Sequence, residues 1–93
     1  MIVAFVWDMN KSVDNVLKHG VSFEKAQQAF FDEQRKIFID EKHSEHEKRY
    51  FCLSTVDGEI LTVRFTIRGE DIRIIGAGFW RKGRKMYHEN EKE

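Results

Sequence analysis

Hydrophobic and polar residues alternate with two different periods along the chain, and the first third has the pattern of a strand followed by helices. β-Branched and aromatic residues from Ile2 to Trp7 predict a first strand. Asp8 can then cap a helix in which Val13, Val16 and Leu17 fall at helical spacing. We therefore expect a strand that runs directly into a short helix.

A second helix is predicted just after the first one ends. Gly20 can take the left-handed conformation that closes a helix, and Lys18 and His19 place basic side chains in the last turn. Ser22 can cap the next helix. The apolar stripe of that helix is Phe23, Ala26 and Phe30.

From Gln34 onward the period changes to two, which is typical of strands. The candidate strands are Lys36 to Asp40, Arg49 to Val56, Ile60 to Ile67 and Ile72 to Ala77. Asp57 and Gly58 suit a tight hairpin turn, and residues 68–71 form a second turn. One face of the strand after the hairpin is Leu61, Val63, Phe65 and Ile67, and the other is Thr62, Arg64, Thr66 and Arg68. The segment from Phe79 resembles a basic helix.

This order of elements is typical of an α+β domain. We expect an antiparallel sheet of about four to five strands, packed against helices on one face, in the order β-α-α-β-β-β-β-α. The 93 residues suffice for one modest core, so residues 1–93 should form a single domain, with residues 88–93 as a frayed tail.

The charge distribution is more informative than the formal net charge of zero. Residues 60–88 contain seven basic and two acidic side chains, a local excess of +5, which the remainder balances. An anionic partner responds to such clustering rather than to the total charge.

Cysteine usage and hydrophobicity limit the class of protein. Cys52 is the only cysteine, so a disulfide framework and a thiolate metal cluster are excluded. The longest apolar run, residues 2–7, is far shorter than the roughly 20 residues that span a bilayer, and no basic signal region precedes it. We expect a cytoplasmic protein.

Common catalytic motifs are missing from the sequence. It contains no glycine-rich phosphate loop, no Gly-x-Ser-x-Gly elbow and no His-Glu-x-x-His helix. The stretch from His43 to Glu47 has histidines beside carboxylates, but a polar loop with Ser44 and Glu47 as a capping box explains it better than a metal site does.

Two features have both a structural and a chemical interpretation. Lys18 and His19 can simply offset the partial negative charge at a helix C-terminus, which their position favours. They can also move a proton and hold a phosphate. The basic third combines arginine forks with aromatic rings, which suits single-stranded RNA, but its last helix can equally be a solvated helix that packs Trp80 and Tyr87 onto the sheet. The candidate RNA-binding residues are Arg64, Trp80, Lys82, Arg84, Lys85 and Tyr87.

Together these residues resemble the BrnT family over nearly the whole chain. The matching positions are Phe5, Trp7, Asp8, Lys11 and Asn15; Lys18 to Glu24 with Ala26; His43, Ser44, Glu47 and Arg49; Phe65, Thr66, Arg68 and Gly69; Ile72 to Ile75; and Tyr87. The contiguous Lys-His-Gly-Val-Ser-Phe stretch is the most characteristic.

The resemblance implies a RelE-like fold and a ribonuclease toxin that works without metal or cofactor and arrests translation. It also implies that a cognate, BrnA-like ribbon-helix-helix antitoxin neutralises the toxin. The complex of the two would contact operator DNA only through this antitoxin. The reaction would be attack of a ribose 2′-hydroxyl on the adjacent phosphate. By matching position, His19 or Lys18 would handle protons, and Arg68 and Arg73 would hold the phosphate.

The sequence departs from the family pattern near its end. Gly76 and Gly78 stand where the family commonly has serine and arginine, and Gly83 stands in a position usually held by glutamate. Either Arg81 replaces the missing cation, or the activity is weakened or altered. The alternatives are a non-catalytic RelE-like module that pairs with a ribbon-helix-helix regulator, and an autonomous nucleic-acid-binding domain.

Overall fold

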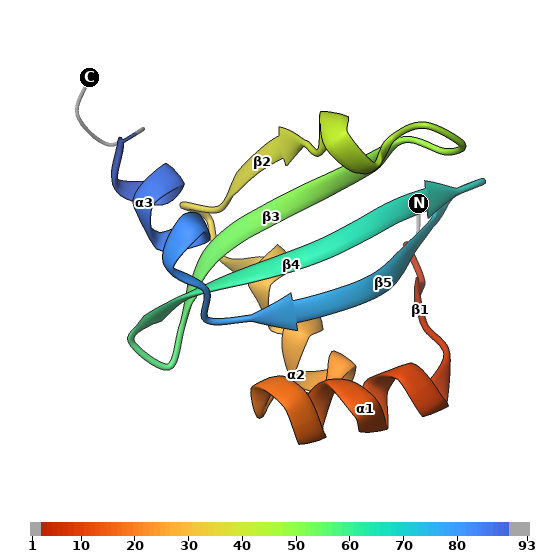
Figure 1. The fold of residues 1–93 in the computed structure, drawn as a ribbon, viewed down its shortest axis with the longest axis horizontal. Helices are drawn as coiled ribbons and strands as arrows, with labels where there is room; N and C mark the ends of the chain where they lie inside the picture. The colour runs from red at the N-terminus through yellow and green to blue at the C-terminus, as the bar shows by residue number, and fades with distance from the viewer. Residues whose placement is uncertain (1–2, 90–93) are drawn as a thin grey trace.

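A computed structural model describes residues 3–89 of the protein and shows an α+β fold (Figure 1). Its strands are β1 (Phe5–Val6), β2 (Lys36–Ile39), β3 (Arg49–Val56), β4 (Glu59–Arg68) and β5 (Asp71–Gly78). Its helices are α1 (Met9–His19), α2 (Phe23–Ala26) and α3 (Arg81–Glu89), with 3₁₀ turns η1 (Gln27–Phe31) and η2 (Glu41–His43). The predicted element order is confirmed. Ile2, placed in the predicted first strand, and most of the predicted frayed tail lie outside the described residues.

The five strands form one mixed sheet in the order β1-β5-β4-β3-β2. Neighbours from β2 to β5 are antiparallel, as expected, and the addition of β1 parallel to β5 makes the sheet mixed. The short β1 has no hairpin partner and instead adds to the free edge of β5, where Ile72 N donates to Ala4 O at 2.9 Å. A two-residue pairing of this kind is set by tertiary contacts, which local sequence patterns do not report.

Local turn and capping chemistry agrees with the sequence. The Asp8 carboxylate accepts from the backbone of Asn10 and Lys11, and Gly20 closes α1 at φ 72°. The Ser22 hydroxyl accepts from Lys25 N at the start of α2. The β3–β4 hairpin turns at residues 57–58, both with positive φ, as such a tight turn requires.

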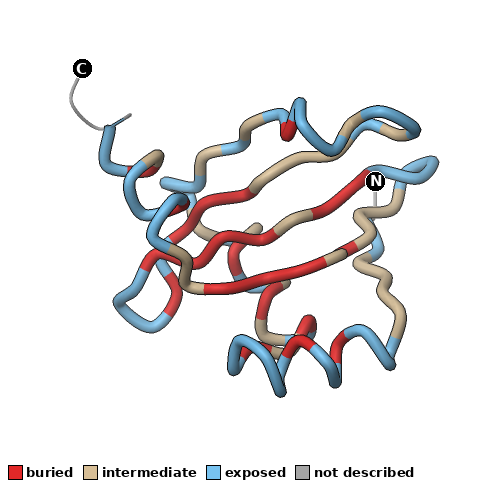
Figure 2. The backbone as a smooth tube through the Cα atoms, viewed as in Figure 1, coloured by how far each residue is buried: buried red, intermediate tan, exposed pale blue. Residues whose placement is uncertain are grey.

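Most of the core lies between the sheet and the α1–α2 side of the molecule, where the centres of the strands are buried (Figure 2). Its largest fully buried members are Phe23, Leu61, Ile74, Val21 and Val63. The opposite face is partly covered by α3, contrary to the expectation that helices cover one face only. There Tyr87 packs with Leu53 and Ile60 in a second, smaller cluster. Gly83 permits this approach, because a Cβ at that position would lie 1.8 Å from Thr62 Oγ1.

Helix α1 buries polar side chains and exposes its apolar ones. Ser12 and Asn15 are its buried residues, whereas the helically spaced Val13, Val16 and Leu17 are exposed. The Asn15 carboxamide donates to Ala77 O at 2.8 Å and to Val21 O at 2.8 Å, and its Oδ1 accepts from Ala77 N at 3.3 Å. It therefore takes the place of a strand neighbour along β5, beyond the end of β1.

A second polar anchor joins η1 to β3. The Asp32 carboxylate accepts from Gln34 N at 2.8 Å, Ser54 Oγ at 2.9 Å and Thr55 N at 3.0 Å. These bonds favour the ionised form, and those from the backbone of Gln34 and Thr55 contribute most to holding the pKa of Asp32 below its ordinary value.

We expect Asn15→Ala to lower the free energy of unfolding by about 2–4 kcal/mol, because it leaves buried backbone groups of Val21 and Ala77 without partners. Urea unfolding followed by circular dichroism measures the loss. Asn10→Ala, on the exposed part of the same helix, is the matched control and should change stability by no more than about 0.5 kcal/mol. Equal effects of the two variants would contradict the role assigned to Asn15.

The Asp32 anchor should make stability depend on pH. Because its pKa is lower in the folded than in the unfolded protein, its contribution is present above the unfolded value of about 3.9 and is lost as pH falls through the folded value. Asp32→Asn should flatten this part of the curve of unfolding free energy against pH. Glu33→Gln, which alters the adjacent exposed carboxylate, should leave the slope unchanged; an identical flattening in both variants would refute the assignment.

Candidate functional site

A polar cleft of about 330 Å³ lies where one flank of α1 meets the sheet. Its lining comes from α1, from β4 and β5, and from the link to α3. The lining residues are Lys11, Asp14, Asn15, Lys18, His19, Arg64, Ile75, Gly76 and Trp80. The cleft thus unites Lys18 and His19 with two candidate RNA-binding residues, Arg64 and Trp80, from distant parts of the chain.

Helical spacing explains the α1 side of the cleft. Lys11 and Lys18 each lie three or four positions from both Asp14 and Asn15, so the four residues share a face. Asn15 fixes this face against β5, and the Gly20 cap ends the helix just after His19. Lys11 and Asp14 were not predicted as cleft residues from the sequence. Their helical spacing from Lys18 could have indicated that they lie on the same side of the helix.

The sheet side of the cleft is shaped by a register irregularity. Arg64 of β4 pairs with Gly76 of β5, but the next residue, Phe65, pairs with Ile74. Ile75 therefore has no partner on β4, as in a β-bulge. A Cβ at Gly76 would lie 3.9 Å from Arg64 Cδ, so the arginine stem passes close over the glycine. Gly76 therefore lies in the cleft lining beside the Arg64 stem, at a position where an added Cβ would make ordinary contact only.

Trp80 forms the wall of the cleft beside His19. The two rings meet edge to face, with centroids 5.1 Å apart and an interplanar angle of 90°. The indole also covers Gly78, where an added Cβ would lie 2.3 Å from Trp80 Cε2. The glycine that stands in place of an expected arginine is therefore covered by a tryptophan from two positions further along.

The cleft carries excess positive charge. Lys11, Lys18 and Arg64 contribute three cations against the single carboxylate of Asp14. Among residues 3–89, none of these three cations forms an ion pair within 4 Å with a carboxylate. Such a site favours an anion, and arginine adds the planar geometry that suits a phosphate.

The other three residues predicted to be catalytic do not line this cleft. Arg68, near the end of β4, bonds Glu47 at 3.3 Å. Arg73 lies on β5 opposite Thr66, and Arg81 is exposed in the first turn of α3. Arg68, Arg73 and Arg81 are therefore not among the residues that line the cleft with Lys18 and His19.

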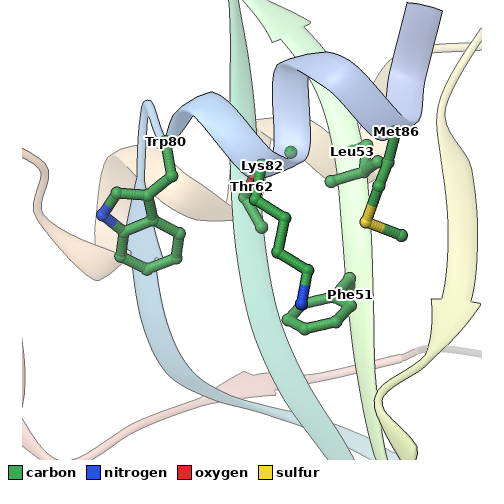
Figure 3. A pocket seen from close by; sticks show the side chains of 7 residues that line it. Phe51, Leu53, Thr62, Trp80, Lys82 and Met86 are labelled. Carbon is green, nitrogen blue, oxygen red and sulfur yellow. The ribbon is translucent and has the colours of Figure 1, made fainter. Parts of the chain in front are cut away.

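The candidate RNA-binding residues of α3 divide into exposed and packed ones. Lys82, Arg84 and Lys85 are exposed, and Figure 3 shows Lys82 extending over Phe51. Tyr87, in contrast, is only 6% exposed, and its ring lies under Lys36 Nζ, 4.9 Å from the ring centroid. A base-stacking role for Tyr87 does not fit this packing, which corresponds to the alternative of an aromatic ring packed on the sheet.

The segment of residues 43–47 forms neither a helix cap nor a metal site in the structure. No helix follows Ser44, whose hydroxyl instead accepts from Arg49 N at 2.9 Å and donates to Asp40 O at 2.6 Å, so the capping-box prediction was wrong. His43 Nδ1 lies 2.9 Å from a buried Asp40 oxygen. Within the described part of the chain, no three His, Cys, Asp or Glu side chains are grouped to hold a metal.

Cys52 is not placed to act as a nucleophile. It is fully buried in the main core, and burial raises the pKa of its thiol to about 12. A thiolate is thus rare at neutral pH.

Comparison with known proteins adds one match. The family described as "Ribonuclease toxin, BrnT, of type II toxin-antitoxin system" matches residues 7–83. This range includes every residue that lines the cleft. No curated protein matches the sequence. None of the helices within residues 3–89 is long and apolar enough to cross a membrane.

The contact between Trp80 and Gly78 can be tested with a pair of glycine substitutions. Gly78→Ala should displace the indole, shift its Nε1–H resonance in the NMR spectrum and lower the unfolding free energy by about 1–3 kcal/mol. Gly76→Ala is the matched control, because its Cβ meets only Arg64 Cδ, at ordinary contact distance. An unchanged Trp80 resonance in Gly78→Ala would show that the indole does not cover this position.

Proposed function

The chain belongs to the BrnT family of ribonuclease toxins of type II toxin–antitoxin systems, and we propose that it cleaves single-stranded RNA in the cleft beside α1. The observation that carries this proposal is the convergence of a histidine, three cations and an indole in one cleft. The expected reaction requires these kinds of group: a proton carrier, positive charge around a phosphate and an aromatic ring for a base.

The reaction follows from the chemistry of RNA. The ribose 2′-oxygen attacks the adjacent phosphorus, its proton passes to a base, and the bond from phosphorus to the 5′-oxygen breaks. The leaving 5′-oxygen takes a proton, so the products are a 2′,3′-cyclic phosphate and a 5′-hydroxyl. We assign proton transfer to His19, with Lys18 as the second proton carrier, since histidine is the side chain that most often acts as a general acid or base.

Arg64 is the cation that we assign to the phosphate. It enters the cleft from the centre of the sheet, on a strand paired along both sides, and is therefore held more rigidly than a side chain on a terminal helix. Lys11 and Lys18 add charge from the opposite wall. These three cations can offset the charge that develops on the phosphate, so we propose a reaction that needs neither a metal ion nor a cofactor.

The remaining basic residues are assigned to the RNA strand outside the cleft. Arg73 lies on the sheet face that carries Arg64, and Arg81, Lys82, Arg84 and Lys85 lie on the adjacent α3. Phosphate contacts of this kind contribute affinity without sequence preference. Arg68 is the least available of these residues, because Glu47 already pairs with it.

Family membership implies an antitoxin partner. We propose that it is a BrnA-like ribbon-helix-helix protein, that the complex contacts operator DNA only through that antitoxin, and that cleavage of cytoplasmic RNA inhibits translation. The alternative of a non-catalytic binding module rested on the missing arginine at Gly78. The presence of Arg64 in the cleft weakens that alternative.

Cleavage by purified variants tests the proposed site. His19→Ala and Arg64→Ala should each slow cleavage of a single-stranded RNA at least about a hundredfold, since each removes a group that acts in the transition state. Lys42→Ala removes an exposed cation from η2 and is the control that should leave the rate unchanged. EDTA should not affect the wild-type rate.

The same assay separates the competing assignments. Arg81→Ala should reduce the rate only a few-fold if Arg64 holds the phosphate, whereas a hundredfold loss would move the phosphate site to α3. Loss of activity in EDTA would refute the metal-free reaction. A folded wild-type protein that neither cleaves RNA nor arrests growth would be a binding module.

A further inference from the structure

The exposed large hydrophobic side chains of residues 3–89 all gather on two adjoining surfaces. One surface comprises Val3, Phe31, Ile37 and Ile67, which line one groove, with Ile39 two positions after Ile37 on β2. The other comprises Met9, Val13, Val16 and Leu17 on α1. Phe31 and Leu17 are 72% and 79% exposed, so they are far from buried in the isolated chain. Contiguous apolar surface of this kind marks a site of protein association.

Both surfaces are hollowed. The first contains a groove of about 560 Å³, lined by Val3, Phe5, Phe31, Ile37 and further apolar side chains from the uncovered part of the sheet. The second borders a hollow of about 270 Å³, whose lining combines the apolar Trp7, Met9, Val13 and Val16 with the polar Ser12, Ser22 and Glu24. Grooves can receive the ridge of an amphipathic helix or an extended segment.

The segment around β1 joins the two hollows. Phe5 lines the groove and Trp7 lines the hollow beside α1, and alternate residues of an extended segment point to the same side. We call this continuous surface the apolar band: the groove residues, Trp7 and the stripe Met9, Val13, Val16 and Leu17. It lies on the side of the sheet opposite Arg64, which alternates with the groove residue Phe65 along β4.

We propose that the apolar band is the docking surface for the antitoxin, which binds it through a segment that is apolar on one side and acidic at its flank. This inference rests on the proposed function, because family membership supplies the antitoxin as the partner. Docking here leaves the basic face of the sheet uncovered. Helix α1 carries the apolar stripe on one side and lines the cleft with the other. The antitoxin would therefore bind the helix that positions His19.

Charge favours an antitoxin over a second copy of this chain. Of the described residues that line the groove, Arg35 alone is charged. A second copy docked through the same surface would bring its own Arg35 towards this one, because the same patch meets itself in a two-fold dimer. An acidic segment would instead complement this arginine.

Titration of the toxin with its antitoxin tests the docking surface. The probe is the purified product of the short reading frame next to the toxin gene, and all toxins carry His19→Ala so that free toxin can be produced. Leu17→Glu and Phe31→Glu should each weaken binding at least about tenfold, because they place a charge in an apolar contact. Val13→Glu is a second test on α1, should either variant fail to keep the melting temperature of the parent.

The matched controls reverse single charges on the basic helix α3 instead. Lys82→Glu and Lys85→Glu should change affinity less than about threefold, and affinity should change little between 50 and 500 mM salt, since apolar burial is not screened. Strong effects of these controls, together with steep salt dependence and no effect of Leu17→Glu, would place the antitoxin on α3 and overturn the proposal.

Two further measurements separate the remaining outcomes. If toxin alone sediments as a dimer that Leu17→Glu converts to a monomer, the apolar band joins two copies and the proposal fails. Cleavage by Leu17→Glu with His19 intact should equal the wild-type rate while resisting neutralisation. If the wild type cleaves no RNA, the proposed function fails, but the titration still decides where the antitoxin binds.

Discussion

The carboxamide of Asn15 joins α1 to the edge of the sheet, and both proposed working surfaces depend on this contact. Beyond the end of β1, the outer edge of β5 exposes a backbone N–H and C=O at Ala77, which Asn15 pairs as a neighbouring strand would. Buried backbone groups are costly to leave unpaired, so this contact fixes the position of the helix as well as its rotation. That rotation directs Lys18 and His19 into the cleft with Arg64.

The same rotation explains why α1 buries its polar side chains and exposes its apolar ones, which is the reverse of the usual arrangement. A helix that packs through an apolar stripe would bury Val13, Val16 and Leu17, whereas this one buries Ser12 and Asn15 in hydrogen bonds. Helix α1 therefore has three different sides. A polar side forms hydrogen bonds with β5, a charged side lines the cleft, and an apolar side is exposed to solvent. Exposing the apolar flank costs hydrophobic stabilisation, which a partner protein can supply on binding.

Local chemistry could be predicted from the sequence, and long-range packing could not. The caps at Asp8, Gly20 and Ser22 and the hairpin at Asp57 depend on neighbouring residues only, and the structure contains them all. The parallel pairing of β1 with β5 joins segments more than sixty residues apart, so no period in the sequence reports it. The sequence likewise left open whether Tyr87 is exposed to bind RNA or packed on the sheet. The packing of α3 buries it. Lys18, His19, Arg64 and Trp80 were all candidate residues from the sequence, but only the fold shows that they line one cleft.

The glycines of β5 show why positional comparison with a family can mislead about chemistry. Position by position, Gly78 marks the loss of a cation and suggests weakened activity. In three dimensions the Trp80 indole covers that position, and Arg64 of the adjacent strand lies only at ordinary contact distance from where a Cβ at Gly76 would be. A phosphate responds to the positive charge around it and not to the strand that supplies it, so the phosphate contact proposed for Arg64 on β4 does not require a cation on β5. The departure at Gly78 is therefore explained by packing, because the Trp80 indole occupies the space that a side chain there would need.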